Sequence, residues 1–142
     1  MTLQSRSRPY AVLLALLLLY WVISLHQLDV TPPVYEDEPW QASTGWMLAT
    51  DGVFGSDMFS GFYGMESRYF GFMPVFPLLL AGTFRLIGLG LFQARLVAVM
   101  MGLLTLVLTY SLGSRLFRPP VGLLAVVLML SLIHISEPTR PY

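Results

Sequence analysis

The 142-residue sequence contains no cysteine, no lysine and no asparagine. These absences exclude disulfides, thiolate nucleophiles, zinc–thiolate sites, Schiff-base and P-loop chemistry, and N-glycan acceptor sites. Charge is also scarce, because 11% of the residues are charged and 56% are hydrophobic, whereas soluble domains carry about a quarter charged residues. The formal net charge of 0 provides no basic field for nucleic acid. The sequence therefore indicates a membrane protein with no nucleic-acid partner.

A first apolar run covers residues 10–28 and holds few polar side chains, all but its tyrosines near its C-terminal end. A helix of this length nearly spans a hydrocarbon core of about 30 Å. Arg6 and Arg8 precede the run, so residues 1–9 are expected on the cytoplasmic side. A cleaved signal peptide is the alternative, but no small-x-small cleavage site precedes Asp29. We therefore predict a transmembrane helix over 10–28.

The stretch that follows is acidic and aromatic. Between positions 29 and 72 it holds seven of the eight acidic residues and a single basic one, Arg68; the acids are Asp29, Glu36, Asp37, Glu38, Asp51, Asp57 and Glu66. It also holds ten aromatic residues: Tyr35, Trp40, Trp46, Phe54, Phe59, Phe62, Tyr63, Tyr69, Phe70 and Phe72. Because such a composition suits the far side of the membrane, close to the headgroups, we predict that residues 29–95 form an external loop.

Two shorter apolar runs come next. Residues 74–87 are too few for a typical span and include Arg85, so they are more often interfacial or re-entrant. Residues 96–112 are long enough to cross. If 74–87 also crossed, Arg115 and Arg118 would fall outside, whereas an interfacial 74–87 keeps both arginines inside, as the positive-inside rule favours. We therefore predict a juxtamembrane helix over 74–87 and a second transmembrane helix over 96–112.

The C-terminal part is expected to begin with a cytoplasmic loop over 113–120. Residues 121–133 then start a third transmembrane helix that is truncated, because polar residues and prolines follow it. The tail, residues 131–142, reads SLIHISEPTRPY and resembles a translated sequencing adaptor. We therefore expect a non-native tail on an N-terminal fragment, and we assign no function to His134 or Glu137.

The acidic cluster Glu36-Asp37-Glu38 precedes Pro39 and is the place where chemistry is expected. Proline favours the first position of a helix and the residue before it often caps the helix, so Glu38 is predicted to start a helix over about 39–50. A carboxylate at a helix N-terminus is stabilised in its ionised form. Such a group can act as a general base or bind a cation. The alternative is a solvated, acidic helix cap.

Five short motifs follow one another along residues 10–130: Tyr35-Glu36-Asp37-Glu38, Met73-Pro74-Val75-Phe76-Pro77-Leu78, Leu86-Ile87-Gly88, Ala94-Arg95-Leu96 and Ser114-Arg115-Leu116-Phe117. In this order and spacing they resemble the start of the GT-C glycosyltransferases. The nearest branch is the dolichyl-phosphate-mannose protein mannosyltransferase-like group, glycosyltransferase family 39. The resemblance implies an all-α integral membrane fold, here the N-terminal part of a multi-span GT-C bundle with juxtamembrane helices in the first external loop.

The resemblance also implies an activity and partners. A member of this group moves a sugar from a polyprenyl-phosphate donor, in the lipid bilayer, to an acceptor outside the cytoplasm, and this chain alone is expected to be an inactive fragment. The Asp of the family's Asp-Glu pair, held to be the catalytic base, falls on Asp37, with Glu38 as its partner. The family's Arg at the outer end of the second span falls on Arg95. The usual Lys before the Pro-Pro-Leu motif is absent, because Phe72-Met73-Pro74-Val75-Phe76 stands there.

The reaction that this resemblance implies needs a general base and a cationic group that stabilises the leaving phosphate. Asp37 would take the acceptor proton as C1 of the sugar inverts. An arginine can stabilise the leaving phosphate with forked hydrogen bonds, and Arg95 is the first candidate and Arg68 the second. For Arg95 the alternative is a side chain that snorkels at a helix end.

Metal binding and a non-catalytic role stay open at this level. Without cysteine, and with two histidines, a tight transition-metal site is not expected, while an oxygen-ligated divalent cation at Glu36, Asp37 and Glu38 is an alternative. The expected location is the plasma (inner) membrane, with several spans. The alternative function is a non-catalytic multi-span protein, such as a transporter fragment or a scaffold subunit.

Overall fold

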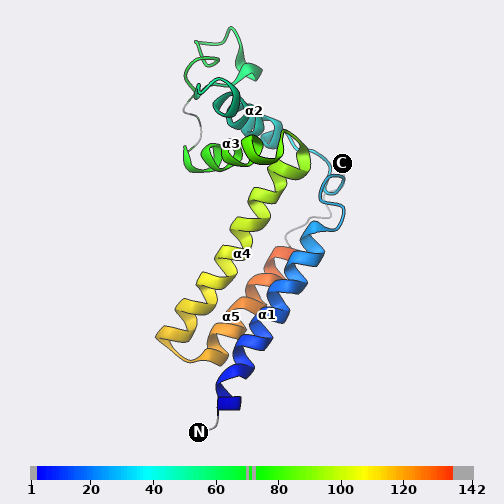
Figure 1. The fold of residues 1–142 in the computed structure, drawn as a ribbon, viewed down its shortest axis with the longest axis vertical. Coiled ribbons are helices and arrows are strands. Elements are labelled where there is room, and N and C mark those ends of the chain that lie inside the picture. The colour runs from blue at the N-terminus through cyan, green and yellow to red at the C-terminus, as the bar shows by residue number, and fades with distance from the viewer. Residues whose placement is uncertain (1–2, 70, 72, 136–142) are drawn as a thin grey trace. The chain divides into compact units, whose positions relative to one another are not determined.

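The computed structural model describes residues 3–69, 71 and 73–135. It contains five α-helices and a short 3₁₀ helix: α1 (Leu3–Leu25), α2 (Asp37–Thr50), η1 (Asp57–Phe59), α3 (Val75–Ile87), α4 (Leu91–Leu116) and α5 (Pro119–Ile135) (Figure 1). No strand occurs within this described part, so the predicted all-α fold class is confirmed. Phe70, Phe72, Glu137 and the rest of the tail from 136 lie outside the described residues.

Two helices, α1 over its apolar part Arg8–Leu25 and α4, are long and apolar enough to cross a membrane. The run predicted over 10–28 lies largely in α1, and the run predicted over 96–112 lies within α4. The apolar helices α3 and α5 are shorter. The described part is therefore all-α, with two helices that could span a membrane and two shorter apolar helices.

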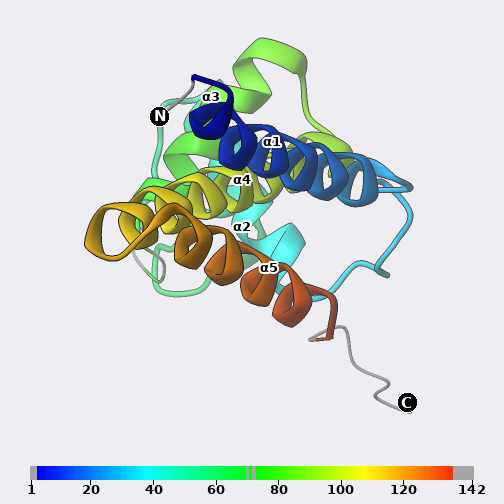
Figure 2. The same cartoon turned by 90° about the horizontal axis from the view of Figure 1, so that it is seen from below.

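The chain divides into two compact units. The apolar unit comprises residues 1–26 and 99–142, and the loop unit comprises residues 27–98. In the apolar unit, α1 and α5 lie side by side (Figures 1 and 2). In the loop unit, α2 and α3 lie side by side.

Small residues let the helices of the apolar unit approach one another. Gly113 of α4 faces Gly122 of α5, and a Cβ on Gly113 would lie 2.9 Å from the Gly122 Cα. Gly102 leaves room for the hydroxyl of Tyr20, which donates a hydrogen bond to the Val99 carbonyl over 3.3 Å. Close backbone approach at small residues is the usual way in which helices associate in lipid.

The core of the loop unit lies between α2 and α3. Its buried residues are Ala49, Leu80, Ala81, Phe84 and Val97. Gly45 on α2 makes this contact close, because a Cβ there would lie 2.6 Å from the Cβ of Leu80. The predicted helices at about 39–50 and 74–87 therefore pair within one unit, so that each covers the apolar face of the other.

The start of α2 lies two residues before the predicted start at about residue 39. The helix begins at Asp37 with Glu36 at the N-cap, so Glu38 lies in its first turn, and it ends at Thr50, close to the predicted end. Pro39 lies in the first turn, where backbone N–H groups have no carbonyl partner within the helix. Its missing N–H therefore costs no helical hydrogen bond. At the other end, Arg85 of α3 donates from Nε to the Ala49 carbonyl over 2.8 Å, which places a cation at the negative end of the α2 dipole.

Candidate active site

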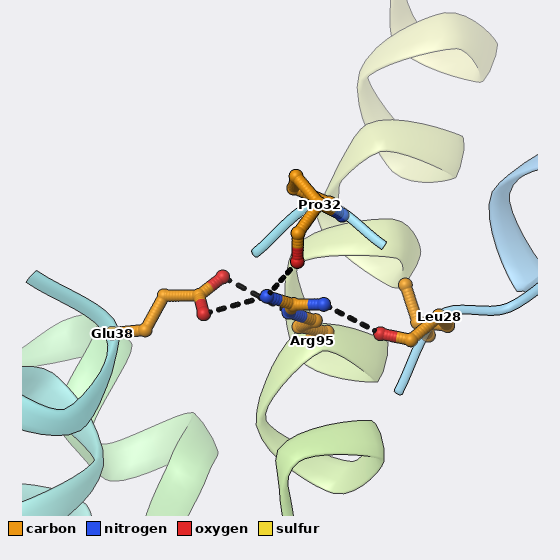
Figure 3. A network of polar contacts seen from close by, with 4 residues as sticks. All are labelled: Leu28, Pro32, Glu38 and Arg95. Atoms are coloured by element: carbon orange, nitrogen blue, oxygen red, sulfur yellow. Dashed lines mark hydrogen bonds and ion pairs between the residues drawn. The ribbon is translucent and has the colours of Figure 1, made fainter. Parts of the chain in front are cut away.

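An ion pair joins two of the predicted site residues. Nε of Arg95 donates to Oε1 of Glu38 over 3.0 Å, and Nη2 donates to Oε2 over 2.8 Å (Figure 3). Arg95 lies near the start of α4 and Glu38 in the first turn of α2. This two-pronged geometry fixes both side chains, because the planar guanidinium matches the carboxylate.

The same guanidinium also binds the chain segment before α2. Nη1 donates to the Leu28 carbonyl over 2.9 Å and Nη2 to the Pro32 carbonyl over 2.8 Å (Figure 3). Together with the bonds to Glu38 these contacts use most of the N–H donors of Arg95. Arg95 therefore ties three separate segments of the loop unit together.

Burial distinguishes the two partners of this pair. The Arg95 side chain is 7% exposed and that of Glu38 is 31% exposed. A snorkelling arginine keeps its charged head in water, whereas the Arg95 head is enclosed by protein acceptors. Since a buried charge is costly without a partner, Glu38 and the two carbonyls are what allow Arg95 to be buried here.

A cleft of about 150 Å³ opens beside the pair. Its lining combines two carboxylates, one amide and one guanidinium with apolar side chains: Asp37, Glu38, Gln41, Phe76, Leu80, Ala94, Arg95 and Ala98. Asp37 is exposed, in the first turn of α2. The cleft therefore offers an accessible carboxylate next to one that is paired with Arg95.

Arg68 lies apart from this arrangement. It is exposed, it does not line the cleft, and its backbone N–H donates to the Gly64 carbonyl over 3.1 Å. The structure thus brings together Asp37, Glu38 and Arg95 but leaves Arg68 in a different part of the loop.

The acidic cluster Glu36-Asp37-Glu38 is the alternative site for an oxygen-ligated divalent cation. Among the residues that the structure describes, no group of three or more His, Cys, Asp or Glu side chains is arranged to hold a metal ion. Glu36 is exposed at the N-cap of α2, while Glu38 is paired with Arg95.

Three contributors to the site are not predicted by the sequence: the Gln41 side chain and the carbonyls of Leu28 and Pro32. Gln41 lies one helical turn after Asp37 and lines the same cleft, and the i, i+4 spacing could have indicated it. The carbonyls of Leu28 and Pro32 carry no signal in the sequence, because any residue has such a group.

Comparison with known proteins gives one match. The model of the dolichyl-phosphate-mannose-protein mannosyltransferase family matches residues 73–140. The match includes Arg95 and lies beyond Asp37, Glu38 and Arg68 in the sequence. No individual curated protein and no solved structure gives a significant match.

Proposed function

From the GT-C glycosyltransferase-like match over residues 73–140, we propose that the chain belongs to a membrane enzyme that moves a sugar from a polyprenyl-phosphate donor to an extracytoplasmic acceptor. The observation that carries the proposal is the cleft in which exposed Asp37 lies beside half-buried Glu38 and its buried partner Arg95. The expected location is the plasma (inner) membrane, with the N-terminus in the cytoplasm and the loop unit outside.

The reaction needs a base at the acceptor. The acceptor nucleophile attacks C1 of the sugar while the bond from C1 to the phosphate oxygen breaks. Its proton passes to Asp37, and polyprenyl phosphate leaves with the electron pair of that bond. Attack opposite to the leaving group inverts the anomeric centre. Polyprenyl phosphate is a good leaving group, so the protein has to supply mainly a base and a fixed geometry.

Glu38 and Arg95 serve this step by positioning. Arg95 holds Glu38 through two hydrogen bonds, and Glu38 follows Asp37 directly on the first turn of α2. The pair therefore fixes the helix end that carries the base. Because most of its N–H donors are engaged by Glu38 and two carbonyls, Arg95 acts by fixing the geometry of the site and not by binding the leaving phosphate.

The test is transfer of a radiolabelled sugar from its polyprenyl phosphate by the full-length protein in membranes. Replacing Asp37 with Asn removes the base without changing the size of the side chain. We expect kcat to fall by about 10²- to 10⁴-fold, the usual contribution of a general base, with the KM for the donor unchanged. The matched control is Asp51→Asn, an exposed acid at the other end of α2, which should keep full activity.

Retained transfer by Asp37→Asn would refute the assignment of the base. No transfer by the native protein with any polyprenyl-phosphate sugar would favour the alternative, a non-catalytic multi-span protein such as a transporter or scaffold subunit.

The positioning role is tested at Glu38. A Glu38→Gln variant keeps one acceptor for Arg95 but loses the charge, so we expect a smaller loss of kcat than for Asp37→Asn and an unchanged donor KM. An increase in donor KM with kcat unchanged would show instead that Glu38 acts in substrate binding.

A further inference from the structure

The side chain of Gln41 contributes an amide to the wall of the cleft that also holds Asp37. Gln41 is half-buried on α2. In the part of the chain that the structure describes, its amide has no hydrogen-bond partner, whereas the Glu38 carboxylate on the same wall is held by Arg95. An amide oxygen accepts hydrogen bonds and an amide nitrogen donates them. The Gln41 amide can therefore bind a ligand without first breaking a bond within the protein.

The size of the cleft limits what can fill it. Its volume is about 150 Å³, and a cavity of about this volume accommodates a single six-membered ring such as benzene. An extended lipid chain or a peptide segment needs more room. Among the parts of the substrates in the reaction proposed above, one sugar ring is therefore the unit that fits.

The lining of the cleft suits a sugar ring in its chemistry. Helices α3 and α4 contribute apolar surface, including the side chains of Phe76 and Leu80, and α2 contributes the polar groups of Asp37 and Gln41. A pyranose ring has apolar C–H faces and a rim of hydroxyls, each of which both donates and accepts hydrogen bonds. An apolar wall with a few polar groups is the usual composition of a site that orients a small ligand.

Charge favours the sugar of the donor over its phosphate in this cleft. Phosphate oxygens beside the Asp37 carboxylate would be repelled. Arg95 is the basic residue of the lining, and most of its N–H donors are engaged by Glu38 and two carbonyls. The phosphate then lies outside the cleft, and the ring that it carries can lie inside.

The spacing along α2 relates Gln41 to the proposed base. Asp37 and Gln41 are one helical turn apart, which places their Cβ atoms about 5–6 Å from each other. In the proposed reaction the acceptor hydroxyl lies between Asp37 and C1 of the transferred sugar. A ring that extends from this point along α2 brings one of its hydroxyls to the Gln41 amide.

We propose that Gln41 binds a hydroxyl of the transferred sugar and thereby orients C1 toward the acceptor, with Phe76 against a C–H face of the ring. This inference rests on the proposed function, because it concerns the donor of that reaction. It adds to that function a residue that recognises the sugar and not the lipid or the phosphate.

The test measures transfer by the full-length protein in membranes with a series of donors. The first donor is polyprenyl-phosphate mannose, the sugar in the description of the matching family, and other polyprenyl-phosphate sugars follow if it is not accepted. Analogues of the accepted donor each lack one ring hydroxyl. For one analogue we expect the kcat/KM of the native protein to fall about 2- to 10-fold, as for the loss of one hydrogen bond.

Gln41→Ala should lose about the same factor with the complete donor, and it should lose nothing more with that one analogue. The KM for the acceptor should stay unchanged. The matched control is Gln93→Ala, because Gln93 is a half-buried glutamine of the same unit that does not line the cleft and donates to the Ile87 carbonyl over 3.5 Å. This control should keep the native kcat/KM and the native response to every analogue.

Three results would overturn the role of Gln41 while leaving Asp37 as the base. They are a native kcat/KM for Gln41→Ala, a rise confined to the acceptor KM, and a loss that adds in full to that of every analogue, which would indicate general damage to the fold. If the native protein transfers none of the sugars, the proposed function and this inference both fail.

Discussion

Arginine side chains join distant segments in the loop unit, and the described part of the apolar unit shows no such charged contact. In the loop unit, side chains reach across the sequence: Arg95 binds Glu38 and two carbonyls, and Arg85 binds the end of α2. In the apolar unit, Thr105 and Ser111 are hydrogen-bonded to carbonyls one turn back on their own helix, those of Met101 and Val107.

Large apolar side chains are exposed along α1 of the apolar unit, among them Val12, Leu14, Leu18, Leu19 and Val22. Lipid accepts such a surface but offers no hydrogen bonds, so hydroxyls there must be satisfied within the helix. The loop unit is held by specific polar contacts, and the exposed apolar face of α1 in the apolar unit suits lipid.

The largest loss of stability is expected on replacement of Arg95, whose side chain joins three segments of the loop unit. Replacing Arg95 with Met leaves Glu38 half-buried without its partner, together with two carbonyls. Breaking a buried pair in this way costs about 3 kcal/mol. Unfolding of the protein in detergent, followed by the fluorescence of Trp40 and Trp46 in the loop unit, measures the loss of stability.

Two further variants separate the ion pair from general damage. Arg68→Met removes an exposed arginine of the same unit and should change the free energy of unfolding by less than about 0.5 kcal/mol. Adding Glu38→Leu to Arg95→Met removes the unpaired carboxylate and should restore part of the lost stability. If Arg95→Met is no more damaging than Arg68→Met, the loop unit is not held by this pair.

A second experiment compares alanine substitutions at two glycines of the loop unit, one on α2 and one on α3. Gly45→Ala places a Cβ 2.6 Å from that of Leu80, and such overpacking costs about 1–3 kcal/mol. Gly82→Ala on α3 meets nothing within 4 Å, so alanine should stabilise the helix by about 0.5–1 kcal/mol. The same unfolding measurement should show a lower free energy of unfolding for Gly45→Ala and a higher one for Gly82→Ala. Changes of the same sign in the two variants would contradict the close α2–α3 contact.

The sequence predicts the helices well, and the reason is physical. Apolar length specifies a helix in a membrane, because the backbone must satisfy its own hydrogen bonds there. The runs at 10–28 and 96–112 therefore coincide with parts of α1 and α4. The helix near 39–50 was signalled by the acids and proline at its start, although it begins at Asp37.

The site was predicted as a set of residues but not as an arrangement. Glu38 and Arg95 are 57 positions apart, and local patterns say nothing about pairs at that separation. Arg95 was expected to bind phosphate or to snorkel, because neither its burial nor its carbonyl partners can be read from its neighbours in the chain. Arg85 likewise looked like an interruption of an apolar run, whereas it binds carbonyls at the end of α2.

A smaller effect is expected for the hydrogen bond that joins α1 to α4 within the apolar unit. Tyr20→Phe removes the donor to the Val99 carbonyl, and such bonds in membranes are worth about 0.6 kcal/mol. The control is Tyr10→Phe, which keeps the edge-to-face contact with Tyr110. Thermal unfolding in bicelles compares the two, and a loss for Tyr20→Phe as large as that for Arg95→Met would remove the contrast between the units.

The smallest predicted effect is a loss of folding stability that occurs only at alkaline pH. Burial raises the pKa of the Tyr69 phenol above its usual 10.0, and a hydrogen bond with Trp40 offsets part of this. Above pH 10 the folded loop unit then keeps a proton that the unfolded chain has lost, so its stability is constant below this pH and falls as the pH rises further. Alkaline unfolding followed by circular dichroism should show this slope in the native protein and in Tyr63→Phe, whose side chain is exposed. Tyr69→Phe should reduce the slope; if it does not, a group other than the Tyr69 phenol causes the loss of stability at high pH.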